Sequence, residues 1–123
     1  MKILTVDDSM TARLMVKNTF EPDGHTVLEA SDGASALSVL QTSLPVDAVV
    51  LDWNMPVMNG LECLKQIRMN AAFNDVKVIM CTTEAERSHV VEAVKAGANG
   101  YVLKPVNMDQ LRAQVTKVCG ISV

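Results

Sequence analysis

The feature that most constrains this chain is a five-fold alternation of short apolar runs with longer stretches of helical periodicity. The apolar runs begin near Ile3, His25, Ala48, Val76 and Tyr101. Strict alternation of strand and helix predicts a parallel sheet that is covered by helices on both faces. Five such units are too few for an eight-fold barrel of about 250 residues. We therefore expect one open, doubly wound α/β sheet with right-handed crossovers.

Capping residues and apolar spacing indicate where the helices begin and which faces they bury. Three pairs have the spacing of a capping box or a related cap: Asn59 with Glu62, Thr83 with Glu86, and Asn107 with Gln110. In the fourth helix we expect Val90, Val91 and Val94 to form the inner face and Gly97 to end the helix.

Length, composition and charge narrow the class of protein. The chain has 123 residues, 49% of them apolar and 20% charged, which predicts a single globular domain over residues 1–123. The net charge of −3 argues against nucleic acid and anionic membranes as partners. Neither a membrane span of about 18 apolar residues nor a signal peptide is expected, so the predicted location is the cytoplasm. Three cysteines without a C-x-x-C pair predict reduced, buried or half-buried thiols.

Reactive side chains follow the ends of four of the five predicted strands. They are Asp7 and Asp8, Asp52, Thr82, and Lys104. Each alone reads as an ordinary turn former, helix cap or solvated lysine. In an open α/β sheet, however, ligands bind beyond the carboxyl ends of the strands, at the point where the winding reverses. Three acids, a hydroxyl and an amine at one edge therefore indicate a functional site.

The chemistry of this predicted site favours a hard divalent cation and phosphoryl transfer. Two like charges about 4 Å apart repel by about 1 kcal/mol in water and by about 4 kcal/mol at an effective dielectric near 20. Oxygen ligands suit Mg²⁺ or Mn²⁺, whereas neither His25, His89 nor any cysteine has the spacing of a zinc site. With a cation bound, Asp52 is a suitable nucleophile for an aspartyl phosphate, and Lys104 can neutralise the transferred group.

The chain resembles the response-regulator receiver family of two-component systems, and its chemotaxis members in particular. The matching segments run in order along almost the whole chain: residues 6–9, 51–56, 59–61, 82–85 and 96–105. The resemblance implies a flavodoxin-like (βα)5 fold whose five parallel strands lie in the order 2-1-3-4-5. It also implies a phosphoacceptor with self-phosphotransfer and autodephosphorylation activity, and not an enzyme in the wider sense.

The resemblance assigns roles to the residues at the strand ends. Asp52 would accept the phosphoryl group from a phosphohistidine of a sensor histidine kinase or phosphotransfer domain. Asp8, Asp52 and the backbone carbonyl of Asn54 would ligate Mg²⁺, while Asp7 would act through a coordinated water. Lys104 would pair with the phosphoryl group, and its peptide bond to Pro105 would be cis.

Further positions form the switch that the resemblance implies. Thr82 would move toward the phosphoryl group and Tyr101 would turn into the vacated space. This change would alter a target-binding face made of the fourth helix, fifth strand and fifth helix. Asn54, Thr83 and Glu84 would tune the lifetime of the phosphorylated state, and we expect relatively quick self-dephosphorylation.

Two neighbouring positions carry expectations of their own. Val106 stands where the family commonly has an aromatic residue. Trp53, next to Asp52, is expected to be partly exposed and to report Mg²⁺ binding by its fluorescence.

Several functions remain open at this point. A stand-alone switch without an output domain is favoured because the five units use the chain from residue 3 to about 119. Chemotaxis is the favoured pathway because of the local similarity to chemotaxis receivers around residues 53–56 and 82–85. A receiver from a longer regulator or hybrid kinase is the alternative. A Mg²⁺-dependent phosphatase is less favoured, because haloacid-dehalogenase-type enzymes place D-x-D after strand one, where this chain has Asp7-Asp8-Ser9. A monomer is expected, and dimerisation on phosphorylation stays open.

Overall fold

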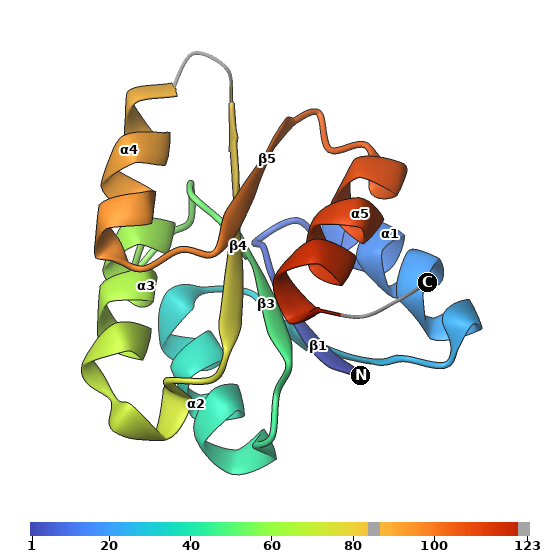
Figure 1. Cartoon of the computed structure of the whole chain (residues 1–123), viewed down its shortest axis with the longest axis horizontal. Coiled ribbons are helices and arrows are strands. Elements are labelled where there is room, and N and C mark those ends of the chain that lie inside the picture. Colours follow the sequence, from blue (N-terminus) through green and yellow to red (C-terminus); the bar gives the residue numbers. More distant parts are fainter. Residues whose placement is uncertain (84–86, 121–123) are drawn as a thin grey trace.

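Five parallel strands form one sheet at the centre of the computed structural model, which describes residues 1–83 and 87–120 (Figure 1). The strands are β1 (Lys2–Val6), β2 (Thr26–Ala30), β3 (Ala48–Asp52), β4 (Lys77–Thr83) and β5 (Gly100–Lys104). They lie in the order β2-β1-β3-β4-β5 and all neighbouring pairs are parallel. The predicted fold class and strand order are therefore confirmed.

Helices cover both faces of this sheet. They are α1 (Met10–Phe20), α2 (Gly33–Ser43), α3 (Gly60–Met69), α4 (Arg87–Ala96) and α5 (Met108–Cys119), with short 3₁₀ turns η1 (Glu21–Asp23) and η2 (Ala71–Phe73). Figure 1 shows α1 and α5 on one side of the strands and α2, α3 and α4 on the other. This arrangement is the doubly wound architecture that the alternation predicts.

Alternate side chains of each strand point into two separate apolar cores, as the two-residue period of a strand requires. In β1, Leu4 and Val6 pack with α2, α3 and α4, whereas Ile3 packs with α1 and α5. The central strand β3 is buried along its whole length. Burial on both faces explains why this strand reads as a nearly continuous apolar run.

The helix caps follow the sequence closely. Asn59 and Glu62 form the predicted capping box at the start of α3. The side chain of Asn107 accepts hydrogen bonds from the backbone N–H groups of Asp109 and Gln110 at the start of α5. Of the remaining predicted pair, Thr83 is the last residue of β4, and Glu86 lies outside the described residues.

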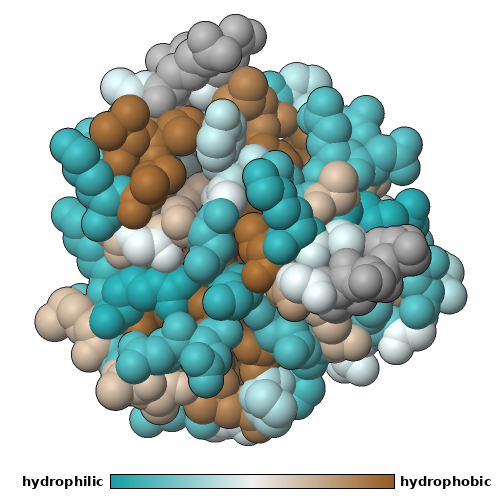
Figure 2. Space-filling view, viewed as in Figure 1, coloured by the Kyte–Doolittle hydropathy of each residue, from teal (hydrophilic) through white to brown (hydrophobic). Residues whose placement is uncertain are grey.

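The predicted inner face of α4 is wrong in part. Val91 and Val94 are 56% and 58% exposed, and among residues 88–96 of this helix the buried one is Ala93. Ala93 and Ala96 pack against the core, and their small side chains allow α4 to approach it closely. Hydrophobic surface appears in Figure 2 at the upper left, over the position of α4 in Figure 1.

The three cysteines are free thiols, as predicted. Cys63 and Cys81 are buried and Cys119 is half-buried. Burial raises the pKa of both Cys63 and Cys81 to about 12, so these thiols stay protonated at neutral pH. In the part of the chain that the structure describes, no helix has the length and apolar character needed to span a membrane.

Candidate functional site

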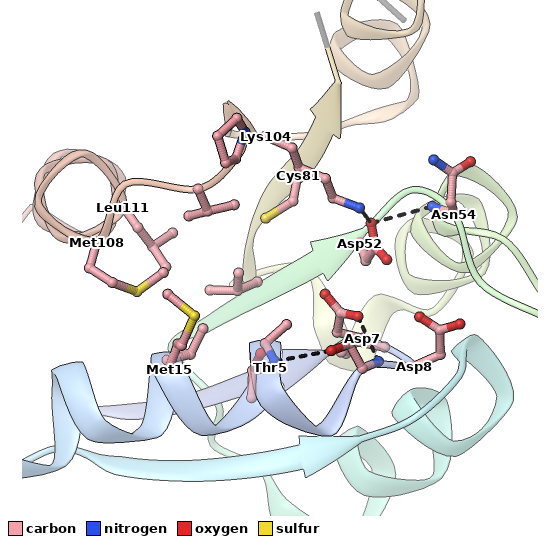
Figure 3. A pocket seen from close by; sticks show the side chains of 17 residues that line it. Thr5, Asp7, Asp8, Met15, Asp52, Asn54, Cys81, Lys104, Met108 and Leu111 are labelled. Carbon is pink, nitrogen blue, oxygen red and sulfur yellow. Dashed lines mark hydrogen bonds and ion pairs between the residues drawn. The ribbon is translucent and has the colours of Figure 1, made fainter.

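Three aspartates from two adjacent strands meet at the carboxyl edge of the sheet. Asp7 and Asp8 directly follow β1, and Asp52 is the last residue of β3. The register pairs Val6 with Leu51, so the chain directions bring these acids to the same level. One carboxylate oxygen from each lies within 4.8 Å of the others. Figure 3 shows the three side chains gathered at the mouth of a pocket.

Asp52 is the buried member of this acidic cluster (Asp7, Asp8 and Asp52). It is 3% exposed, while Asp8 is open to solvent. The Lys104 ammonium, at the end of β5, forms an ion pair and hydrogen bond with Asp52 Oδ1. The Asn54 N–H donates to the same oxygen at 3.4 Å. A buried carboxylate needs such partners, because burying an unpaired charge is strongly unfavourable.

The charges in the pocket shift one another's protonation. Burial, together with the nearby Asp52 and Asp8 carboxylates, raises the pKa of Asp7, although its hydrogen bond from the Ser9 N–H and the Lys104 charge oppose this. Burial alone would lower the pKa of Lys104. The hydrogen bond to Asp52 and the attraction of both acids outweigh burial, so the pKa of Lys104 is raised. Lys104 therefore remains a full positive charge at neutral pH.

The acidic cluster fits a hard divalent cation. It offers carboxylate oxygens from two strand ends, which are the ligands that Mg²⁺ and Mn²⁺ prefer. Burial is the main cause of the raised pKa of Asp7, and a cation would relieve the repulsion that the Asp52 and Asp8 carboxylates add to it. Three protein carboxylates leave further coordination positions for water or a phosphate oxygen. The acidic cluster is thus consistent with the metal site of a receiver domain.

Backbone packing holds Asp52 in place from below. The Trp53 N–H donates to the Cys81 carbonyl at 3.1 Å, and the Gly60 N–H donates to the Trp53 carbonyl at 2.9 Å. A Cβ at Gly60 would lie 2.4 Å from the Asp52 carbonyl oxygen, so only glycine allows this close approach of α3.

The prediction that Trp53 is partly exposed is wrong. Trp53 is 6% exposed, and its ring stacks on His89 of α4 with centroids 4.2 Å apart and planes inclined by 8°. The reason is that Trp53 follows the last residue of a fully buried strand and turns toward the core beneath α4. In the sequence, His89 stands out only as a histidine without the spacing of a zinc site, and nothing indicates this stack.

The other predicted site residues lie near the acidic cluster in different ways. Thr82 is buried in β4, one residue beyond Cys81, which pairs with Asp52 in the register. Tyr101 is 44% exposed on β5. The Lys104–Pro105 peptide is cis, and so is Leu44–Pro45, which the sequence did not indicate.

Two residues expected to tune the phosphorylated lifetime complete this set. Thr83 ends β4, and Glu84 lies outside the described residues.

Comparison with known proteins identifies the family of this chain. The family model described as response regulator receiver domain matches residues 3–116. The chain belongs to the response regulator receiver family. A receiver domain is a phosphoacceptor signalling module and not a conventional enzyme. The reactive side chains at the carboxyl edge of this sheet therefore belong to such a module.

Among the relatives of this receiver domain are several chemotaxis proteins of similar length. A CheY homolog of Campylobacter jejuni is 43% identical over 121 residues, covering 98% of this chain and 93% of the relative. CheY1 of Helicobacter pylori is 40% identical, with 98% of each chain covered. The solved structure of CheY4 of Vibrio cholerae superposes with a TM-score of 0.88 at 37% identity, covering 95% of this chain and 97% of that one.

Proposed function

We propose that this receiver domain is a phosphorylation-activated switch that accepts a phosphoryl group on Asp52 with the help of Mg²⁺. We take residues 1–123 as one receiver unit. The observation that carries the proposal is the placement of Asp52, buried between the Asp7 and Asp8 carboxylates and the Lys104 ammonium. A nucleophile, a cation site and a fixed positive charge are the parts that phosphoryl transfer needs.

The donor in this proposal is a phosphohistidine of a sensor histidine kinase or phosphotransfer domain. An Asp52 carboxylate oxygen attacks phosphorus, the phosphorus–nitrogen bond breaks, and the imidazole leaves with the bonding electron pair. Asp8, Asp52 and the Asn54 carbonyl would hold Mg²⁺, and Asp7 would act through a water. Mg²⁺, when bound, supplies positive charge that offsets the phosphoryl oxygens.

Lys104 is the second source of charge in this mechanism. Its ammonium already lies on Asp52 and stays protonated at neutral pH. When Asp52 becomes an acyl phosphate, the carboxylate loses its own charge and the phosphoryl oxygens carry the negative charge instead. Lys104 then exchanges its carboxylate partner for a phosphoryl oxygen, which gives it different partners in the two states.

The output of the switch is assigned to the face of α4, β5 and α5. Thr82 would move to donate to a phosphoryl oxygen, and Tyr101, now 44% exposed, would turn inward. Val91 and Val94 provide exposed apolar surface on α4 that suits a protein target. Asn54, Thr83 and Glu84 would set the lifetime of the phosphorylated state.

Chemotaxis is the pathway that we propose. Its support is that relatives of matching length, at 40% to 43% identity, carry the names of chemotaxis proteins. Signalling would then pass through contact with a downstream protein.

Phosphotransfer from an autophosphorylated sensor kinase tests the proposed function. Radiolabel should move to the wild-type protein in the presence of Mg²⁺ and should fail to reach Asp52→Asn. Asp109→Asn, which removes an exposed carboxylate on α5, is the matched control and should accept label normally. Equal labelling of Asp52→Asn would overturn the assignment.

A further inference from the structure

The pocket that holds the acidic cluster continues away from it as an apolar hollow between α1 and α5. The whole pocket has a volume of about 520 Å³, a size that takes a small organic molecule. Thr5, Val50 and Cys81 of three adjacent strands form its floor. Its walls are formed by Ala12, Met15 and Val16 of α1, Met108 and Leu111 of α5, and Pro105 and Val106 between β5 and α5.

Short and flexible side chains leave this hollow open. Val106 is only half-buried, and its short side chain leaves space between α1 and α5. Met15 is 47% exposed, and Met108 lies opposite it on α5. Figure 3 shows both thioethers directed into the space between the two helices. Unbranched methionines rearrange easily around different apolar ligands, so the hollow can adapt to its occupant.

The mouth of the hollow carries an excess of negative charge. Asp7, Asp8 and Asp52 supply three carboxylates, whereas Lys104 supplies one ammonium that is already paired with Asp52. These carboxylates would repel an anionic amphiphile, and a neutral amphiphile would have no electrostatic attraction to them. A ligand with an apolar body and one positive charge matches both ends of the pocket.

We propose that this pocket binds small amphiphilic amines. The alkyl or aryl body fills the hollow between Met15, Val106 and Met108, and the ammonium group lies on the Asp7 and Asp8 carboxylates. The amine occupies the place of the divalent cation, so the two compete. As a consequence that rests on the proposed function, such an amine inhibits phosphorylation of Asp52.

Methionine-methyl NMR of the metal-free protein tests this binding without any phosphorylation step. The probes are n-hexylamine and its neutral counterpart 1-hexanol. Of the eight methionine signals, those of Met15 and Met108 should shift saturably with hexylamine. Hexanol should bind at least about tenfold more weakly. Added Mg²⁺ should return the signals to their free positions.

Two variants that narrow the hollow separate specific binding from general surface association. Val106→Phe and Ala12→Leu should each weaken hexylamine binding by about tenfold or more. Ala72→Leu, at an exposed position of η2 away from the pocket, should leave it unchanged. The paired design keeps the test valid if one variant fails to fold. Unshifted Met15 and Met108 signals, equal affinity for hexanol, or indifference to Mg²⁺ would overturn the proposal.

The two proposals fail in distinguishable ways. If Asp52 accepts phosphate while hexylamine leaves the Met15 and Met108 methyl groups unmoved, the amine site is wrong and the receiver function stands. If hexylamine binds and yields to Mg²⁺ while Asp52 never accepts phosphate, the amine site stands and the proposed function is wrong.

Discussion

Lys104 reaches past the end of β4 to form an ion pair with Asp52 on β3. The two residues are 52 positions apart in the chain, and β4 lies between their strands. The Lys104 side chain is 28% exposed, whereas the Asp52 side chain is almost fully buried. The acidic cluster thus has one fixed cationic partner before any ligand binds.

Replacing this partner should slow phosphorylation. Lys104→Met keeps the apolar stem but removes the charge, so we expect phosphorylation of Asp52 by a kinase to slow by about tenfold or more. The rate of label transfer measures the effect. Lys117→Met, which removes an exposed lysine of α5, is the control and should behave as wild type. Unchanged transfer to Lys104→Met would exclude the assigned role.

Removing the charge of Asp7 should stabilise the metal-free protein. Since the folded state raises the pKa of Asp7 above its ordinary value of 3.8, the charged form is disfavoured in the fold. The contribution of Asp7 to stability is therefore greatest below this value and is lost as the pH rises through the folded pKa. At pH 7, Asp7→Asn should add about 1 kcal/mol to the free energy of unfolding, a figure that allows for solvent screening.

Urea denaturation at two pH values checks the sign of this effect. The gain in the free energy of unfolding of Asp7→Asn should vanish near pH 3, where Asp7 is protonated in both the folded and unfolded states of the wild type. At pH 7, saturating Mg²⁺ should make the wild type more stable than Asp7→Asn. A loss of stability for Asp7→Asn without metal would contradict the inference that burial and neighbouring carboxylates disfavour the charged form of Asp7.

Trp53 should report Mg²⁺ binding by its fluorescence. It is the only tryptophan, it directly follows Asp52, and its ring is held on His89. A cation bound to Asp52 adds charge one residue along the chain from this indole, so titration with Mg²⁺ should change the emission saturably. Asp8→Asn should shift the midpoint to higher Mg²⁺ concentration, and an emission that never responds would contradict the assigned site.

Arg68 should contribute more to stability than an ordinary surface arginine. It donates to the Asn99 side chain at 2.9 Å and to three backbone carbonyls. These carbonyls belong to Phe73, Val76 and Gly97. Arg68→Ala would leave them without this donor, so we expect a loss of about 3 kcal/mol in the free energy of unfolding by urea. Lys65→Ala, an exposed lysine of α3, should cost less than about 0.5 kcal/mol.

The left-handed backbone conformation of Val57 should destabilise the folded protein. This β-branched residue has a φ of 69° and is 85% exposed in the loop between β3 and α3. Glycine adopts this left-handed conformation freely, so Val57→Gly should raise the free energy of unfolding by up to about 1 kcal/mol. Val57→Ala keeps the Cβ and should gain less. A thermal midpoint that falls for the glycine variant would rule out strain at this position.

The sequence predicts the strand ends well, because the groups that matter directly follow apolar runs. Asp7 and Asp8, Asp52 and Lys104 each lie where a strand reaches the carboxyl edge of the sheet, so the topology alone brings them together. Which face of a helix is buried is harder to predict from the sequence. On α4, Ala93 and Ala96 face the core while Val91 and Val94 face outward, which reverses what hydrophobicity suggests.

Features that depend on contacts between distant segments were also out of reach. The Trp53–His89 stack, the Arg68 interactions and the hollow beside Val106 each join residues from separate elements. Local pattern carries no information on such pairings. The resemblance to receivers did draw attention to Val106, but only the packing of α1 against α5 reveals the space beside it.

Chemical mapping of the phosphorylated residue tests the central claim most directly. After labelling by a sensor kinase, reduction with borohydride converts an aspartyl phosphate to homoserine, which peptide mass spectrometry can locate. The proposed function predicts homoserine at position 52 alone, dependent on Mg²⁺. Homoserine at Asp7 or Asp8, or phosphate retained on a hydroxyl or imidazole side chain, would contradict it.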